Sequence, residues 1–341
     1  MKKLIIFILF IGIGLIGFTA CSSSDAVTPA TAEVNPATLV PTAAEEILVH
    51  TNVPGEAPAD VSYKSGDQDS SPMADKKRSP GGDRFTFGRF ERPFNADTMD
   101  VYFPDLDIQD TWLVEDELWI YAGLVLKSTS DDGALRGKYG FEIDSDVDGG
   151  GDWLVLVDQP ASLEWSTSGV HVLFDANDDV GGLPKVNADS PQTVGDGYES
   201  VLLDSDNGDD PDLAWSKVVL QEPVTVQFAI KRSILESDDA YMVGMWAGTD
   251  DFDPALFDLN DHYSHEQAGA ASPDFEYFYP IKALSELDNA CRIPIGFQPV
   301  GSEPGLCPVA VPKNAPGEAP SCKQTYCYPV GNQQICICIA Q

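Results

Sequence analysis

The chain has 341 residues, of which 55 are Asp or Glu and only 20 are Lys or Arg, so its formal net charge is −35. Such an acidic surface repels nucleic acid and anionic lipid, which excludes direct binding to either as a function. It attracts divalent cations instead and keeps the protein soluble.

The first residues have the pattern of a secretory signal peptide. Lys2 and Lys3 precede an apolar run over residues 4–20, which is the charge order of such signals. The run ends in Gly17-Phe-Thr-Ala-Cys21, which resembles a bacterial lipobox except that Phe18 replaces the usual Leu. We expect residues 1–20 to be removed and Cys21 to carry a lipid. That lipid would be the sole membrane contact and would hold the protein in the bacterial cell envelope, at the cell surface or the periplasmic face. A signal cleaved without lipidation and an uncleaved anchor are the alternatives.

Composition divides the remaining chain into three parts. Residues 21–83 are rich in Ser, Thr, Ala, Pro and acidic residues and contain one aromatic residue, Tyr63. Such a segment buries too little apolar surface to offset its ordering entropy, so we expect a disordered stalk. Residues 84–288 contain all six Trp residues and are long enough for one hydrophobic core. Residues 289–341 form a Pro- and Gly-rich appendage with six cysteines.

The main domain alternates short apolar runs with Gly, Asp and Pro, which is typical of strands and turns. The expected strands cover residues 112–115, 117–127, 138–143, 153–158, 169–175, 198–203, 213–220, 224–230 and 240–247. Helical signals are short and occur at residues 231–236 and 281–287. We therefore predict an all-β protein, an antiparallel β-sandwich of jelly-roll or immunoglobulin-like type with short helices and a disulfide-rich C-terminal tail.

The stretch Asp144-Ser-Asp-Val-Asp-Gly-Gly-Gly-Asp152 has carboxylates at its first, third, fifth and ninth positions and Gly149 at its sixth. Alternate residues of a tightly wound loop point inward, so these carboxylates converge, and repel one another unless a cation is bound. A backbone carbonyl after the glycine turns inward as well. This set of oxygen donors suits Ca²⁺. The predicted ligands are Asp144, Asp146, Asp148, Gly150 and Asp152.

The flanking residues indicate the kind of calcium site. Val155 stands where an EF-hand would need a bidentate Glu, and residues 139–143 and 153–157 have strand composition. The loop is similar to the strand–loop–strand Asp-x-Asp-x-Asp-Gly-x-x-Asp sites of integrin α-subunit propeller blades, although a single copy does not indicate a propeller. The alternative is a solvated acidic hairpin tip.

A second acidic stretch, residues 204–212, also has alternating oxygen-bearing side chains and a glycine. It is a candidate for a second calcium site, and a solvated loop is the alternative. The candidate ligands are Asp204, Asp206, Asp209 and Asp212.

The cysteines besides Cys21 all lie in the tail: Cys291, Cys307, Cys322, Cys327, Cys336 and Cys338. An even number in an exported chain predicts up to three disulfides. Cys336 and Cys338 are too close in sequence to pair easily with each other. A zinc site is the alternative, but an oxidising compartment disfavours it.

The strand over residues 117–126 is apolar on both faces. Its even-numbered residues share one face, while Trp119 and Tyr121 share the other with Val125. One face lines the core. The other is a candidate platform on which aromatic rings stack against sugars; the alternative is that loops or the tail cover both rings.

Three stretches carry a resemblance to known families: Tyr102-Phe-Pro-Asp-Leu-Asp-Ile108, Glu117-Leu-Trp-Ile-Tyr121 and Tyr139-Gly-Phe-Glu-Ile-Asp144, with Trp112 between the first two. They resemble the opening of carbohydrate-binding family 9-like and DOMON-like β-sandwiches, and of uncharacterised bacterial envelope proteins with a similar acidic loop. The resemblance covers residues 97–285. It implies a sandwich fold more than a function, and the sugar-stacking and haem-ligating residues of those families are not placed on this chain.

Three function classes follow from these features. The first is a calcium-stabilised surface binding module, with a glycan or another cell-surface ligand as its partner. The second is a structural or adhesive envelope protein without a small ligand. The third is an extracellular glycan-active enzyme, which would need two convergent carboxylates. The sequence has no nucleophile elbow, phosphate-binding loop or Cys–His pair, so catalysis is the least favoured class.

Overall fold

A computed structural model describes residues 49–72, 90–95, 99–180, 197–235, 239–249, 285–299, 303 and 306, and the backbone of residues 324–330 and 333–339. Strands dominate these ranges, and the helical turns are short 3₁₀ segments such as η3 (Arg232–Leu235). Within the described part, no helix is long and apolar enough to cross a membrane. The predicted all-β class is therefore confirmed.

The first sheet has five antiparallel strands in the order β1-β3-β4-β11-β10. Their bounds are β1 (Tyr63–Gly66), β3 (Ile108–Glu115), β4 (Trp119–Leu126), β11 (Thr225–Lys231) and β10 (Ala214–Val219). The central strand β4 is paired along its length with β3 and β11, so it is buried on both edges.

The second sheet runs in the order β2-β13-β12-β5-β6-β7-β8-β9, and β14 also pairs with β12. The bounds are β2 (Glu91–Arg92), β13 (Leu287–Asn289), β12 (Tyr241–Gly248), β5 (Lys138–Asp144), β6 (Trp153–Asp158), β7 (Val170–Phe174), β8 (Ser200–Asp204), β9 (Asn207–Gly208) and β14 (Ile293–Ile295). A separate two-stranded sheet consists of β15 (Gln324–Val330) and β16 (Gln333–Ile339).

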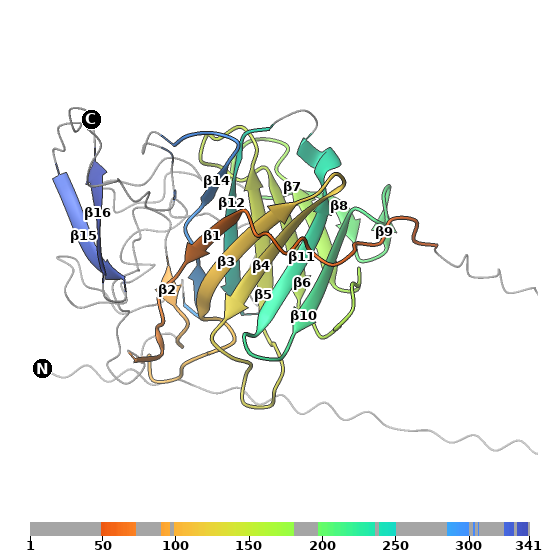
Figure 1. The fold of residues 1–341 in the computed structure, drawn as a ribbon. Coiled ribbons are helices and arrows are strands. Elements are labelled where there is room, and N and C mark those ends of the chain that lie inside the picture. Colours follow the sequence, from red (N-terminus) through yellow and green to blue (C-terminus); the bar gives the residue numbers. More distant parts are fainter. Residues whose placement is uncertain are drawn as a thin grey trace, which may run out of the picture. The chain divides into compact units, whose positions relative to one another are not determined.

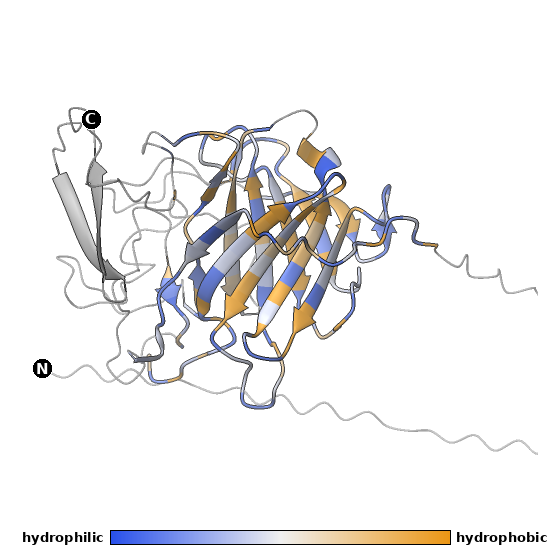
Figure 2. Ribbon diagram, viewed as in Figure 1, coloured by the Kyte–Doolittle hydropathy of each residue, from blue (hydrophilic) through white to orange (hydrophobic). Residues whose placement is uncertain are grey.

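The two large sheets pack face to face as a sandwich (Figure 1). Ile120 and Leu124 of β4 belong to the same buried cluster as Phe141 and Ile143 of β5. Across the interface, the ring centroids of Phe141 and Phe228 lie 6.2 Å apart. Figure 2 shows apolar residues concentrated on the strands and hydrophilic residues in the connecting loops. The alternation of side chains along each strand thus supplies the core from both sheets.

All nine predicted strands are present, each within a few residues of its predicted bounds. The helical signal at residues 231–236 corresponds to the 3₁₀ turn η3. Leu287, the end of the second helical signal, instead belongs to β13. The predicted end of the domain at residue 288 was too early, because β14 (Ile293–Ile295) pairs with β12 in the second sheet.

The predicted stalk is wrong over residues 49–72. Tyr63–Gly66 forms β1 and pairs with β3, and residues 49–62 cross the outer face of the first sheet before it (Figure 1). Trp165 donates from Nε1 to the carbonyl oxygen of Gly55 at 2.9 Å, and Lys217 Nζ lies 3.1 Å from Glu56 Oε2. A segment too polar to fold by itself is therefore ordered by an existing apolar face. The other residues of the predicted stalk lie outside the described part, as does the signal peptide.

Candidate metal centre

The acidic loop predicted to bind calcium connects two neighbouring central strands of the second sheet, β5 and β6. Val147 and Gly149 have positive φ values of 64° and 104°, so the chain turns sharply here. Position 151 requires glycine because the Tyr198 side chain lies close to the backbone there: a Cβ atom would be 2.0 Å from the hydroxyl oxygen of Tyr198. The local sequence therefore fixes a tight hairpin loop whose two ends are held by paired strands.

Three of the four predicted carboxylates converge. Asp144, Asp146 and Asp152 each offer an oxygen, and these oxygens lie within 4.8 Å of one another. The fourth, Asp148, is not in this group; its Oδ1 accepts a hydrogen bond from Gly150 N at 2.7 Å. The spacing thus predicted three carboxylates that converge, and Asp148 is not part of this group.

Backbone N–H groups hold the loop carboxylates in place. Asp144 accepts from Val147 N at 2.6 Å and from Gly149 N at 3.0 Å. Asp152 Oδ2 accepts from both the backbone N and the hydroxyl of Ser145, each at 2.6 Å. Because these donors restrict the carboxylates before any ligand arrives, the site is largely preorganised.

Burial changes the pKa of two of the converging aspartates. It raises the pKa of Asp144 to about 7, although Arg292 and the N–H groups of Gly149 and Val147 act in the opposite direction. Burial also raises the pKa of Asp146, and the charge of Asp148 adds to that increase. Ionising Asp144 in the folded chain is therefore costly unless a positive charge lies nearby. A divalent cation bound at this loop would supply such a charge and would lower that cost.

Arg292, just before β14, lies behind the loop and has no counterpart in the sequence-based prediction. Its Nη2 lies 2.6 Å from Glu142 Oε1, and its Nη1 donates to the carbonyl oxygen of Gly149 at 2.6 Å. The same nitrogen lies 3.3 Å from Asp144 Oδ2. Glu142 also accepts a hydrogen bond from the hydroxyl of Tyr198 at 3.0 Å. These groups meet only through the fold, so no local sequence signal identifies them.

The structure does not support the predicted second calcium site at residues 204–212. Its carboxylates do not form a group of converging ligands within the described residues. Asp204 lies beside His171, at 3.2 Å from its Nδ1, and Asp206 accepts a hydrogen bond from Thr167. Asp212 anchors the 49–62 segment, as described next. The acidic side chains along this stretch therefore have different protein partners.

Asp212 is almost fully buried (2 % exposed). Its Oδ2 accepts hydrogen bonds from Thr51 N, Thr51 Oγ1 and Asn52 N at 2.8–2.9 Å, and its Oδ1 lies 2.7 Å from His50 Nδ1. Burial alone would raise the pKa of Asp212, but the hydrogen bonds from Asn52, Thr51 and His50 outweigh it and lower the pKa to about 2.

The lowered pKa gives a pH prediction for Asp212→Asn. An ordinary Asp titrates near about 3.9 when unfolded, so the carboxylate contributes its full stability above about pH 4 and loses it as pH falls toward 2. We expect the variant to be less stable than the unsubstituted protein by about 1.5–3 kcal/mol at pH 6, the range for hydrogen bonds to a charged group. Urea denaturation across pH should show the difference shrinking below pH 4. A difference independent of pH would contradict this role.

The predicted aromatic platform is also wrong, because both rings are buried: Trp119 is 3 % exposed and Tyr121 is 1 % exposed. They pack in a cluster with Trp215, and Trp165 and Ala57 lie against it. The hydroxyl of Tyr121 donates to Asp116 Oδ2 at 3.2 Å. The 49–62 segment and the loop carrying Trp165 cover the face that the sequence left open.

The remaining predicted residues are in the anchor and the tail. Cys21, Cys307 and Cys322 lie outside the described residues. Cys291 is buried, and its Sγ lies 2.9 Å from the hydroxyl oxygen of Ser65 in β1. In the β15–β16 pair, the register places Cys327 directly opposite Cys336 and Cys338 opposite Thr325.

Comparison with models of known protein families, with curated proteins and with solved structures finds no match for this chain. The geometry of its own residues is therefore the basis for the functional proposal.

Proposed function

We propose that this chain is an exported structural or adhesive protein of the bacterial cell envelope, built on a β-sandwich that Ca²⁺ stabilises through the loop at residues 144–152. The observation that carries the proposal is the convergence of Asp144, Asp146 and Asp152 between two central strands. Oxygen donors from carboxylates are those that Ca²⁺ prefers. An ion there fixes the register of β5 and β6, on which the rest of the second sheet builds.

A structural or adhesive role is favoured over glycan binding by the exposed surface. The large hydrophobic side chains exposed among the described residues are all aliphatic: Val49, Val53, Val101, Leu118, Leu163, Val201 and Leu220. Stacking on sugar rings needs exposed aromatic rings, and the two candidates, Trp119 and Tyr121, are buried. Glycan binding stays a prediction without a described platform to support it.

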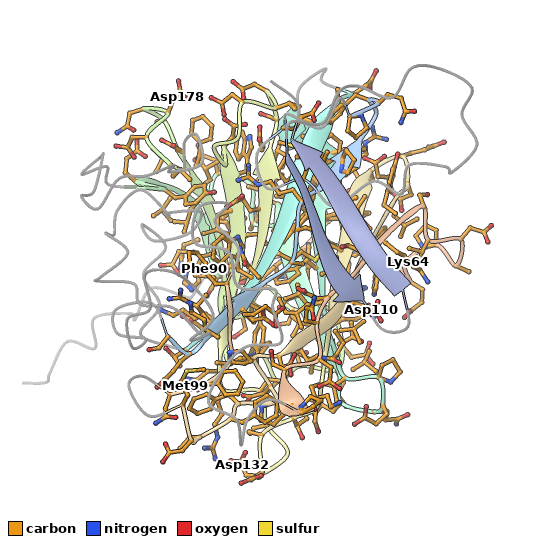
Figure 3. The ribbon with its side chains drawn as sticks, turned by 90° about the vertical axis from the view of Figure 1, so that its left-hand side faces the viewer. Lys64, Phe90, Met99, Asp110, Asp132 and Asp178 are labelled. Atoms are coloured by element: carbon orange, nitrogen blue, oxygen red, sulfur yellow. The ribbon has the colours of Figure 1, made fainter. Side chains whose placement is uncertain are left out.

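Catalysis has little support from the described surface. A pocket of about 370 Å³ is lined by residues 132–136, residues 159–161 and Leu220. Asp132, one of its lining residues, is labelled in Figure 3. Asp132 is its one acidic lining residue and lies 2.5 Å from Arg136 Nη2. Glycoside hydrolysis needs a second carboxylate at a set separation, so this pocket does not suit that reaction.

The calcium proposal is tested by adding CaCl₂ or EDTA to the purified protein. With Ca²⁺ at tenfold its dissociation constant, the free energy of unfolding should rise by about 1.4 kcal/mol, or about 3–6 °C in melting temperature for a domain of this size. Mg²⁺ should substitute poorly, because it requires a smaller and stricter octahedron.

The matched variants are Asp146→Ala, which removes a ligand, and Asp131→Ala, which removes an exposed acidic residue elsewhere. The first should lose the response to Ca²⁺ and the second should keep it. Identical melting curves in CaCl₂ and EDTA, together with no calcium by elemental analysis, would refute the site.

Export and lipid anchoring are part of the same proposal, supported by Lys2, Lys3, the apolar run and Ala20-Cys21. The six tail cysteines should then be oxidised; Cys291, which is buried and disulfide-bonded, supports this. Two readouts test it in the native host or a bacterial one. Cys21→Ser should move the protein from the detergent phase to the aqueous phase, and the denatured, unreduced protein should show no free thiol among the six. Unchanged partitioning, or several reactive thiols, would argue against it.

A further inference from the structure

A second group of acidic side chains lies at the edge of the sandwich, away from the calcium loop. Asp67 follows β1 in the first sheet, whereas Glu91 and Asp288 belong to β2 and β13 of the second sheet. Each offers one carboxylate oxygen, and these oxygens lie within 4.8 Å of one another. In Figure 1, β1 and β2 lie at the same edge, and Figure 3 faces that edge with Lys64 of β1 and Phe90 beside β2 labelled.

The three carboxylates are oriented by hydrogen bonds from neighbouring groups. Asp67 Oδ1 accepts from Gln68 N at 2.9 Å, Glu91 Oε2 accepts from the hydroxyl of Ser70 at 2.7 Å, and Asp288 Oδ2 accepts from Ile108 N at 2.7 Å. One oxygen of each carboxylate is thus fixed by a protein donor. This arrangement is typical of metal ligands whose positions are set by surrounding groups.

One oxygen of Asp288 has no hydrogen-bond donor among the described residues. This residue is fully buried (0 % exposed), and the oxygen without a donor is Oδ1. A buried carboxylate oxygen without a donor bears the full cost of losing water. The register adds to that cost, because Glu91 and Asp288 are directly opposite each other on paired strands, where like charges are destabilising.

The surroundings are acidic as well. Asp107, also fully buried, accepts hydrogen bonds from Ser70 N and from the hydroxyl of Tyr102. Burial raises the pKa of Glu91 and of Asp288 well above the usual range, and neighbouring carboxylates raise them further. Converging buried carboxylates need either protons or a metal ion to offset their charges.

We propose that Asp67, Glu91 and Asp288 bind a second Ca²⁺ ion that joins the two sheets at this edge. The group consists of carboxylate oxygens, with no His or Cys among its members in the described part, which suits a hard divalent cation and not zinc. The ion would tie the segment after β1 to the β2–β13 pair. It would thereby hold residues 63–72, which pair with the first sheet through β1, against the second sheet as well.

The competing explanation is a shared proton. Burial, and then the charges of Asp288 and Asp67, raise the pKa of Glu91, so a proton held between two of these carboxylates offers another way to reduce the repulsion. The two explanations predict opposite effects for removing one charge. With a metal ion, Glu91→Gln removes a ligand and weakens the protein. With a shared proton, the same change replaces a buried acid by a neutral isostere and leaves stability equal or greater.

The test measures bound calcium and melting temperature for the full chain in CaCl₂ and in EDTA. The unsubstituted protein should hold two calcium ions, and Glu91→Gln and Asp146→Asn should each hold one. In CaCl₂, Glu91→Gln should melt about 3–6 °C below the unsubstituted protein. In EDTA it should melt higher, because one of the repelling charges is gone. Glu117→Gln, an exposed acidic residue on the same domain, should change neither quantity.

A Glu91→Gln protein that keeps both ions, or that is at least as stable in both buffers, would overturn the proposal in favour of the shared proton. If the Glu91→Gln protein does not fold, the calcium content of the Asp146→Asn protein still tests the second site. The Asp146→Asn protein should retain one ion, which Asp288→Asn should remove in turn; zero calcium in Asp146→Asn alone would overturn the second site. Failure of the 144–152 loop proposal gives a different result, in which Asp146→Asn leaves the calcium content unchanged.

Discussion

The Trp119→Ala variant is expected to lose about 3–5 kcal/mol of unfolding free energy, the range for removing a large aromatic side chain from a packed core. The indole is 3 % exposed and lies in a cluster with Tyr121, Trp215 and Val114 on the outer face of the first sheet. Truncation leaves a cavity that the 49–62 segment and the rigid sheet cannot fill. Chemical denaturation measured by tryptophan fluorescence and by circular dichroism checks the size of the loss.

Leu118 supplies the matched control, because it is the neighbouring residue and is 42 % exposed. Leu118→Ala should change stability by no more than about 0.5 kcal/mol, as is usual for exposed positions. If Trp119→Ala denatures at the same midpoint as Leu118→Ala, the ring is not part of a packed cluster. In that case the face carrying Trp119 and Tyr121 would again be a candidate for ligand binding.

Replacing Arg292 with Met should cost about 3–5 kcal/mol, the range for breaking a buried ion pair from one side. Arg292 is 4 % exposed, and its partner Glu142 is 1 % exposed, with 2.6 Å between Nη2 and Oε1. Without the guanidinium, Glu142 is left with an uncompensated buried charge. The Gly149 carbonyl also loses a donor, so the loop at residues 144–152 should become less ordered.

A double-mutant cycle separates this effect from lost packing. Glu142→Gln in the Arg292→Met background should recover part of the stability, because it removes the uncompensated charge and keeps an acceptor for Tyr198. The exposed pair Arg136 and Asp132 lies at 2.5 Å with side chains 64 % and 52 % exposed, so Arg136→Met should have a much smaller effect than Arg292→Met, because water screens an exposed ion pair. Equal costs for Arg292→Met and Arg136→Met would show that the network behind the loop is not a buried one.

Sequence alone was sufficient for the features that depend on local pattern. Alternating β-branched and aromatic residues predicted nine strands and the all-β class, because the side-chain period of two is a property of each strand by itself. The spacing of Asp144, Asp146 and Asp152 predicted a converging group, because nine consecutive residues form one loop. Both signals are complete within a short window of the chain.

The tertiary structure alone decided what covers each surface. Strand β4 is apolar on both faces, so its sequence shows that Trp119 and Tyr121 share a face but not that the 49–62 segment covers it. That segment looks disordered by composition, since the groups that order it, such as Asp212, lie far along the chain. The same holds for Asp67, Glu91 and Asp288, which are far apart in the sequence; strand pairing and sheet packing bring one carboxylate oxygen of each within 4.8 Å of the others. Contacts between distant segments depend on how the whole core packs, and no local pattern of residues encodes them.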